Sequence, residues 1–158
     1  MKTNDDSKPA SGLTLKARAV GYLSRREHSR LELGRKLARF GEEDEVRAVL
    51  DSLEKEGWLS TARYAQSVVH RLAAKQGTAR IVHELRQHGV ADAQIANLRG
   101  ELEATELARA REVWRKRFGA LPADTNQRAK QIRFLTARGF SHATIRQVLR
   151  GVEFDDLD

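Results

Sequence analysis

Leu37-Ala38-Arg39-Phe40-Gly41 returns twice in altered form, as Leu85-Arg86-Gln87-His88-Gly89-Val90 and as Leu135-Thr136-Ala137-Arg138-Gly139-Phe140. The three glycines lie 48 and then 50 residues apart. A glycine four residues after an inward-facing leucine is a common helix stop, because glycine adopts the left-handed conformation without a steric penalty. The period therefore predicts three tandem helical units of about 50 residues, an organisation typical of arrays that bind extended partners.

The composition predicts an all-α fold. Ala, Leu, Arg and Glu dominate, only two prolines occur, and runs of β-branched residues are missing. Apolar residues at helical spacing predict about nine helices, three in each unit, with Ser29, Thr78, Asp124 and Ser141 as N-caps. The expected organisation is a disordered N-terminal tail, three three-helix repeats and an acidic C-terminal tail, at residues 1–13, 14–60, 61–104, 105–150 and 151–158.

Several classes of protein are excluded by what the sequence lacks. The chain has no cysteine, which rules out disulfides and thiolate chemistry and fits the reducing cytoplasm. No apolar stretch approaches the roughly 20 residues needed to span a bilayer. The five histidines do not pair at metal-binding spacing, and the glycines stand singly at helix ends without forming a phosphate loop. We therefore expect a cytoplasmic, non-enzymatic protein with no catalytic residues, metal or cofactor.

Charge is separated into blocks along the chain. The net charge is +7, yet residues 40–56 contain seven acidic and two basic residues, whereas residues 105–150 contain eleven basic and three acidic ones. Such separation suggests a surface that faces a polyanion, together with acidic elements that could contact a protein. Solvated helix faces with a mild basic bias are the simpler alternative.

Permanent cations repeated along a strip are what phosphate binding requires, and arginine predominates here. The candidate nucleic-acid or filament contacts are Arg25, Arg26, Arg30, Arg35, Lys36, Arg63, Arg71, Lys75, Arg80, Arg115, Lys116, Arg117, Arg128, Lys130 and Arg133. The candidate contacts to a partner protein are Glu42, Glu43, Asp44 and Glu45, although the helix dipole also explains acids in a first turn. Trp58 and Trp114 could stack on bases, but core packing is the commoner role and is the one we expect.

The ordered set of motifs resembles the RecX family of bacterial RecA regulators. The residues that carry this resemblance, over about residues 15–150, are Leu23-Ser24-Arg25-Arg26-Glu27-His28-Ser29, Gly57-Trp58-Leu59, Arg63-Tyr64-Ala65, Trp114-Arg115-Lys116-Arg117-Phe118-Gly119 and Lys130-Gln131-Ile132-Arg133-Phe134-Leu135. One departure is Ser60-Thr61, where the family usually has an acidic pair. These hydroxyls can still cap the next helix.

The resemblance implies an elongated, curved array of three-helix repeats. It also implies binding along the RecA–single-stranded DNA filament, and inhibition of strand exchange, ATP hydrolysis and coprotease function in DNA repair and the SOS response. We expect a monomer that binds no membrane; binding to free DNA is left open, as is the choice between capping and coating the filament.

Two other classes are weighed against this one. A helix-turn-helix transcriptional regulator would concentrate its base-reading residues in one recognition helix, whereas here the basic residues are spread over three units. A protein-interaction scaffold without a nucleic-acid role would bind its partners with little dependence on salt. An enzyme ranks last, because no catalytic constellation is present.

Overall fold

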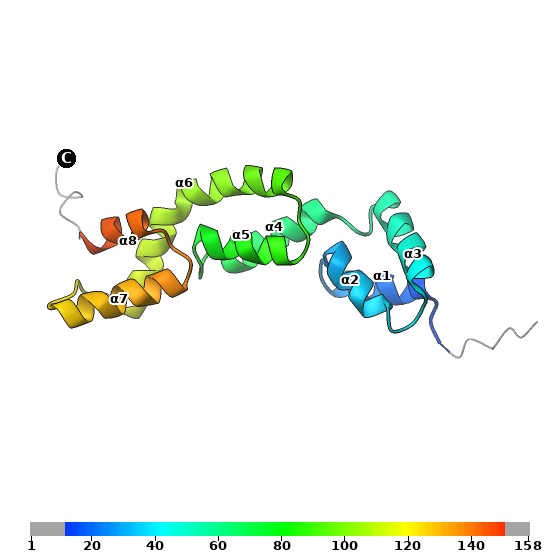
Figure 1. The fold of residues 1–158 in the computed structure, drawn as a ribbon, viewed down its shortest axis with the longest axis horizontal. Helices are drawn as coiled ribbons and strands as arrows, with labels where there is room; N and C mark the ends of the chain where they lie inside the picture. The colour runs from blue at the N-terminus through cyan, green and yellow to red at the C-terminus, as the bar shows by residue number, and fades with distance from the viewer. Residues whose placement is uncertain (1–11, 151–158) are drawn as a thin grey trace, which may run out of the picture. The chain divides into compact units, whose positions relative to one another are not determined.

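The computed structural model describes residues 12–150, and in that range the chain forms eight α-helices and no β-strand (Figure 1). The predicted C-terminal tail lies outside the described residues, as do the first eleven residues of the predicted N-terminal tail. The described residues divide into two compact units, residues 12–64 and residues 65–150.

The first unit is built from three short helices and the beginning of a fourth. These are α1 (Leu15–Arg25), α2 (Arg30–Leu37), α3 (Glu43–Lys55) and the first turn of α4 (Thr61–Leu72). The helices α1, α2 and α3 pack against one another. Their apolar stripes meet in a small core that consists of Ala19, Leu33, Leu37, Val46, Leu50, Leu53 and Leu59.

The second unit is organised around one long helix. It contains the rest of α4, α5 (Thr78–Gln87), α6 (Asp92–Arg117), α7 (Thr125–Ala137) and α8 (His142–Leu149). The long helix α6 contacts α5, α7 and α8 (Figure 1). The apolar core at its C-terminal half consists of Ala110, Val113, Leu135, Phe140, Ile145, Val148 and Leu149.

Residues 12–150 form eight helices where about nine were predicted, because α6 runs through a break that we expected between repeats two and three. Residues 101–108 read Glu-Leu-Glu-Ala-Thr-Glu-Leu-Ala, a run of strong helix formers without glycine or proline. The expected last helix of repeat two and the expected first helix of repeat three are therefore one continuous helix. The two repeats consequently share a rigid element.

Most of the predicted N-caps are confirmed. The hydroxyl of Ser29 accepts from Glu32 N at 3.0 Å, Asp124 Oδ1 accepts from Gln127 N at 2.7 Å, and Ser141 Oγ accepts from Thr144 N at 3.1 Å. Ser60 Oγ likewise accepts from Arg63 N at 3.2 Å, so the hydroxyl at the departure from the family pattern does cap α4.

Two of the three predicted glycine stops have the expected conformation. Gly89 and Gly139 have φ values of 78° and 90°. Gly41 does not lie in the left-handed region, so the prediction is wrong there: α2 ends at Leu37, and Phe40 N donates to Leu37 O at 2.9 Å. Gly41 packs closely against α1, since an added Cβ would lie 2.6 Å from Leu15 Cδ1 and that side chain would have to move.

The two tryptophans differ in position. Trp114 packs against the core of the second unit, as expected, and its indole Nε1 donates to Gln131 Oε1 at 2.8 Å. Trp58 is 46% exposed, so the prediction of core packing is wrong for this residue. The chain turns at Gly57, which has a φ of 83°, and it is Leu59, 3% exposed, that enters the core.

A buried carboxylate joins three helices of the second unit. Thr78 was expected to cap α5, but the N-cap is Gly77, which has no side chain, and Thr78 N donates at 2.9 Å to Glu106 Oε1 from α6. Glu106 Oε2 accepts from Thr144 Oγ1 of α8 at 2.7 Å. Burial opposes ionisation of Glu106, but these hydrogen bonds outweigh it and hold its pKa below the usual value. The buried carboxylate of Glu106 therefore caps the N-terminus of α5 in place of a side chain from the N-cap residue.

Replacing Glu106 with glutamine should destabilise the second unit. The amide keeps the shape of the carboxylate but loses charge-assisted hydrogen bonds, each worth about 1.5–3 kcal/mol. We expect the free energy of unfolding in urea to fall by about 2 kcal/mol. Glu103→Gln, at an exposed position of the same helix, is the matched control and should change stability by less than about 0.5 kcal/mol. Equal stability of the two variants would contradict the role given to Glu106.

Candidate nucleic-acid interface

Most of the predicted cations of the first unit form ion pairs with carboxylates of the same unit. Arg26 forms a two-pronged ion pair with Glu32, in which Nη1 lies 3.1 Å from Oε2. Arg30 contacts two carboxylates of α3, at 2.7 and 3.2 Å. Arg63 Nε donates to Glu27 Oε1 at 2.9 Å. These three arginines therefore have structural partners, and their charge is largely balanced within the unit.

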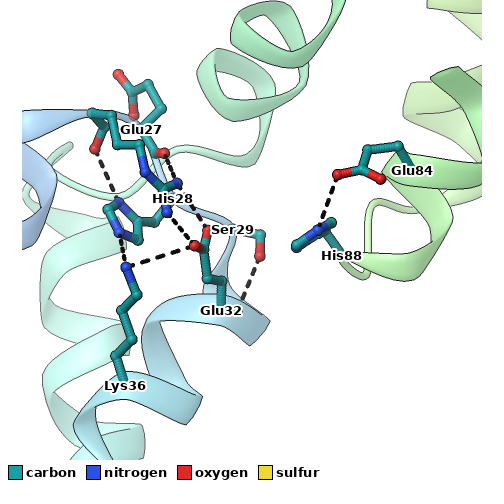
Figure 2. Close-up of polar contacts among 8 residues, drawn as sticks. Glu27, His28, Ser29, Glu32, Lys36, Glu84 and His88 are labelled. Atoms are coloured by element: carbon teal, nitrogen blue, oxygen red, sulfur yellow. Dashed lines mark hydrogen bonds and ion pairs between the residues drawn. The ribbon is translucent and has the colours of Figure 1, made fainter.

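Lys36 belongs to a cluster around a buried histidine (Figure 2). His28 is 1% exposed; its Nδ1 lies 3.0 Å from Arg26 O and its Nε2 lies 2.9 Å from Lys36 Nζ. The ammonium group can only donate, so Nε2 accepts and the proton of a neutral ring lies on Nδ1. Lys36 Nζ also lies 3.7 Å from Glu32 and 4.9 Å from the ring centroid of Tyr22. This lysine is thus held by the fold.

The cluster predicts a dependence of stability on pH. Burial lowers the pKa of His28, and the charges of Arg26 and Lys36 act in the same direction. The hydrogen bond to Arg26 O and the charge of Glu32 oppose them without cancelling the shift. A neutral His28 stabilises the fold fully above its unfolded pKa of about 6.5, and this contribution is lost as the pH falls toward the lower folded pKa. Urea unfolding at pH 7.5 and 5.5 should show a larger loss for the natural chain than for His28→Gln, which cannot titrate. Equal losses would refute this assignment.

The remaining predicted cations of the first unit are Arg25 and Arg35. Both are exposed, and neither has a carboxylate partner among residues 12–150. Arg25 ends α1, and Arg35 lies in the last turn of α2.

The acidic run occupies the start of α3, as predicted. Glu42 is its N-cap residue, and Glu43, Asp44 and Glu45 form its first turn. The side chains of Glu43 and Asp44 are 88% and 95% exposed, although Arg47 lies 3.1 and 3.8 Å from them. The run is accessible to a partner, and the helix dipole explains its placement equally well.

The basic cluster that ends α6 is also partly neutralised. Arg115 Nη2 lies 2.6 Å from Glu112 Oε1, and Lys116 Nζ lies 3.8 Å from the same oxygen. The guanidinium of Arg117 lies over the rings of Phe118 and Phe134, at 5.5 and 5.6 Å from their centroids.

A groove in the second unit gathers cations that are remote in the sequence. It is open, has a volume of about 740 Å³, and lies between the end of α4, one face of α5 and the end of α7. We call it the α5 groove. Its lining residues are Arg71, Leu72, Gln76, Ala79, Arg80, His83, Glu84, Gln87, Thr136, Ala137 and Gly139. This lining is cationic and rich in hydrogen-bond donors, because it contains two arginines, a histidine and two glutamines but only one carboxylate.

The cationic surface extends from the α5 groove along α7. Arg133 and Lys130 lie four and seven residues before the lining residue Ala137, and this spacing places the three side chains on one side of the helix. Both cations are exposed and have no carboxylate partner among residues 12–150. Arg128 is equally exposed but lies five residues before Arg133, on a different side of α7.

The remaining predicted cations of the second unit lie at or beside the α5 groove. Arg80 Nη1 donates to Ala137 O at 2.9 Å, which orients its guanidinium across the groove. Arg71 is exposed and lines the wall that α4 provides. Lys75 is exposed just after α4, and its carbonyl accepts from Arg138 Nη1 at 3.3 Å. Repeats two and three therefore contribute cations to one surface.

Close backbone packing holds the walls of the α5 groove together. Gly77 N donates to Arg138 O at 2.7 Å, and a Cβ on Gly77 would lie 2.3 Å from the backbone of Gly139. Beneath this contact, Arg109 of α6 donates to the carbonyls of Ala73 and Leu102, both at 2.9 Å. The end of α4 is thus tied to the long helix, and the start of α5 is tied to the end of α7.

Glu106, Arg109 and Arg138 organise the second unit through their hydrogen bonds, although they were not among the residues predicted from the sequence. Glu106 follows Leu102 and precedes Ala110 at four-residue spacing, so a carboxylate standing on the apolar stripe of α6 is the signal that could have identified it. Arg109 and Arg138 carry no comparable local signal, because their partners are backbone carbonyls far away in the sequence.

Residues 12–150 contain neither a candidate metal site nor a candidate membrane span. No group of three histidine, aspartate or glutamate side chains in this range could hold a metal ion. None of the described helices is both long and apolar enough to cross a membrane.

The chain is similar to known protein-family models over most of its length. Three family models match it in order: the first three-helix domain of RecX at residues 16–53, the second at residues 62–97 and the third at residues 104–149. The chain belongs to the RecX family. The second and third RecX domains both include part of α6, which agrees with a helix shared between repeats.

Curated relatives support the same assignment over almost the whole length. Regulatory protein RecX of Ralstonia nicotianae is 54% identical over 153 residues, which cover 95% of this chain and 96% of the relative. Regulatory protein RecX of Ralstonia pickettii is 49% identical over 146 residues, 92% of each chain. The crystal structure of RecX from Lactobacillus salivarius, at 21% identity, has a TM-score of 0.71 and covers 86% of this chain and 92% of its own. That last likeness concerns the fold alone.

Proposed function

We propose that this chain is a non-enzymatic regulator that binds RecA–single-stranded DNA filaments and mainly inhibits them. The inhibited activities are strand exchange, ATP hydrolysis and coprotease function, in DNA repair and the SOS response. The protein acts in the cytoplasm as a monomer. The observation that carries this proposal is membership of the RecX family over most of the chain.

The α5 groove and the adjoining face of α7 are the proposed contact to DNA phosphates. Four predicted cations converge there, namely Arg71, Arg80, Lys130 and Arg133, and none of them has a carboxylate partner among residues 12–150. Arginine forks aligned along an open groove suit a phosphodiester backbone, because each can bind a phosphate through two hydrogen bonds. Arg25, Arg35 and Lys75 are secondary contacts, and the acidic start of α3 faces the recombinase protein.

The protein inhibits the recombinase because it occupies the filament surface that the second DNA strand needs. A filament exposes a continuous lattice of phosphates and protein, so a regulator that bridges neighbouring subunits blocks access of the second DNA strand. Binding driven by phosphate contacts releases counterions, and affinity should therefore fall steeply with salt.

The test is RecA-catalysed strand exchange and ATP turnover with this protein at substoichiometric amounts, alongside a direct measurement of filament binding. Inhibition of both reactions in proportion to binding supports the proposal. Full activity of filaments that demonstrably carry the protein would overturn it.

A further inference from the structure

Trp58 is an aromatic side chain that the first unit holds in solvent. It follows α3 in the turn made by Gly57, and it is 46% exposed. The amides of Trp58 and Leu59 both donate to Leu53 O, at 2.9 and 3.1 Å. The backbone on both sides of the indole is therefore tied to the fold, although burial of the ring would be favourable.

Arg63 fixes the same turn from the other side. Its Nη2 donates to Gly57 O at 2.6 Å and to Trp58 O at 3.0 Å, while its Nε donates to Glu27. A guanidinium that bridges two carbonyls and a carboxylate holds the turn in one conformation. The indole is thus presented on a preorganised backbone, which lowers the entropic cost of using it in an interface.

The charges around this turn favour a protein partner over a nucleic acid. Sites that stack aromatic rings on bases pair them with cations that reach the phosphates. Here two of the neighbouring cations already bind carboxylates: Lys16 lies 2.6 Å from Glu56, and Arg30 lies 3.2 Å from Glu54. Lys55 is the exposed cation next to this turn that has no carboxylate partner among residues 12–150. The helix that leads into the turn, α3, carries more acidic than basic residues.

We infer that Trp58 is an anchor residue that inserts into an apolar pocket on a basic protein surface. Exposed tryptophans on rigid backbones are typical energetic centres of protein interfaces, and acidic neighbours select a basic rim around the pocket. This inference rests on the proposed function, because the partner is then the recombinase protein of the filament and not its DNA.

Fluorescence of Trp58 tests this inference in the full chain carrying Trp114→Phe, which leaves a single indole. Adding RecA filaments should shift the emission to shorter wavelength and reduce acrylamide quenching several-fold, whereas single-stranded DNA alone should change neither. An indole already shielded in the free protein, one shielded by DNA alone, or one that stays accessible on the filament would each overturn the inference.

Trp58→Ala in the otherwise natural chain provides a second measurement. We expect its affinity for filaments to fall at least about tenfold, with unchanged affinity for single-stranded DNA. Phe40→Ala is the matched control, since Phe40 is an aromatic residue of the same unit that is 44% exposed, and it should bind filaments normally. If the natural protein binds filaments and the Trp58→Ala variant binds them equally well, this inference is wrong, but the proposed function is not affected. If the natural protein itself does not bind filaments, the proposed function fails as well.

Discussion

Reversing the charges of Arg71 and Arg133 together is expected to weaken binding to RecA–single-stranded DNA filaments by at least about tenfold at physiological salt. The two side chains come from α4 and α7, are exposed, and have no carboxylate partner among residues 12–150, so the Arg→Glu changes should leave the fold intact. Each lost phosphate contact removes about 0.7 from the slope of log affinity against log salt on a single strand. The double variant should therefore show a slope shallower by about 1.4.

The matched control changes the net charge by the same amount elsewhere in the second unit. Arg115→Glu with Lys116→Glu alters two candidate cations that already lie 2.6 and 3.8 Å from Glu112. We expect a loss of less than about threefold, because these charges are largely offset locally. Equal losses for the two double variants would mean that overall charge, and not the α5 groove, governs binding.

Replacing Gly77 with alanine is expected to have the largest effect on stability. The new Cβ would lie 2.3 Å from the backbone of Gly139, which cannot yield as a flexible side chain would, and the 2.7 Å hydrogen bond from Gly77 N to Arg138 O would be strained. We expect the free energy of unfolding to fall by more than about 3 kcal/mol, or the second unit to lose its cooperative transition.

Gly100→Ala is the control for this substitution. Gly100 lies within α6, where an added Cβ would meet nothing within 4 Å, so alanine should stabilise the protein by up to about 1 kcal/mol. Circular dichroism during urea unfolding measures both variants. A Gly77→Ala protein as stable as the natural one would show that the two glycines do not hold the groove together.

Local features of the fold could be predicted from the sequence because they depend on neighbouring residues. Serine or aspartate before an apolar stripe predicted the N-caps at Ser29, Asp124 and Ser141, and glycine after leucine predicted the stops at Gly89 and Gly139. The predicted glycine stop at Gly41 and the predicted core packing of Trp58 were wrong. The helix α2 ends earlier, at Leu37, and the turn at Gly57 leaves Trp58 exposed and brings Leu59 into the core.

Which arginines form internal ion pairs and which remain available to phosphate could not be predicted, because this depends on contacts between residues that are distant in the sequence. Arg30 and Arg63 are as basic as Arg71 in the sequence, yet they bind Asp51 and Glu27 in the folded unit. Arg71 and Arg133 are 62 residues apart, and their helices are brought together by tertiary contacts such as that of Gly77 with Gly139. The sequence identifies the set of cations; tertiary structure determines which of them can bind phosphate.

Photocrosslinking from the wall of the α5 groove tests the central claim most directly. A photoreactive amino acid in place of His83, which lines the groove, should crosslink to single-stranded DNA within RecA filaments. The same probe in place of Arg128, which lies on a different side of α7, should react with DNA much less. Strong crosslinking to DNA from position 128 with none from position 83 would contradict the assignment of the groove.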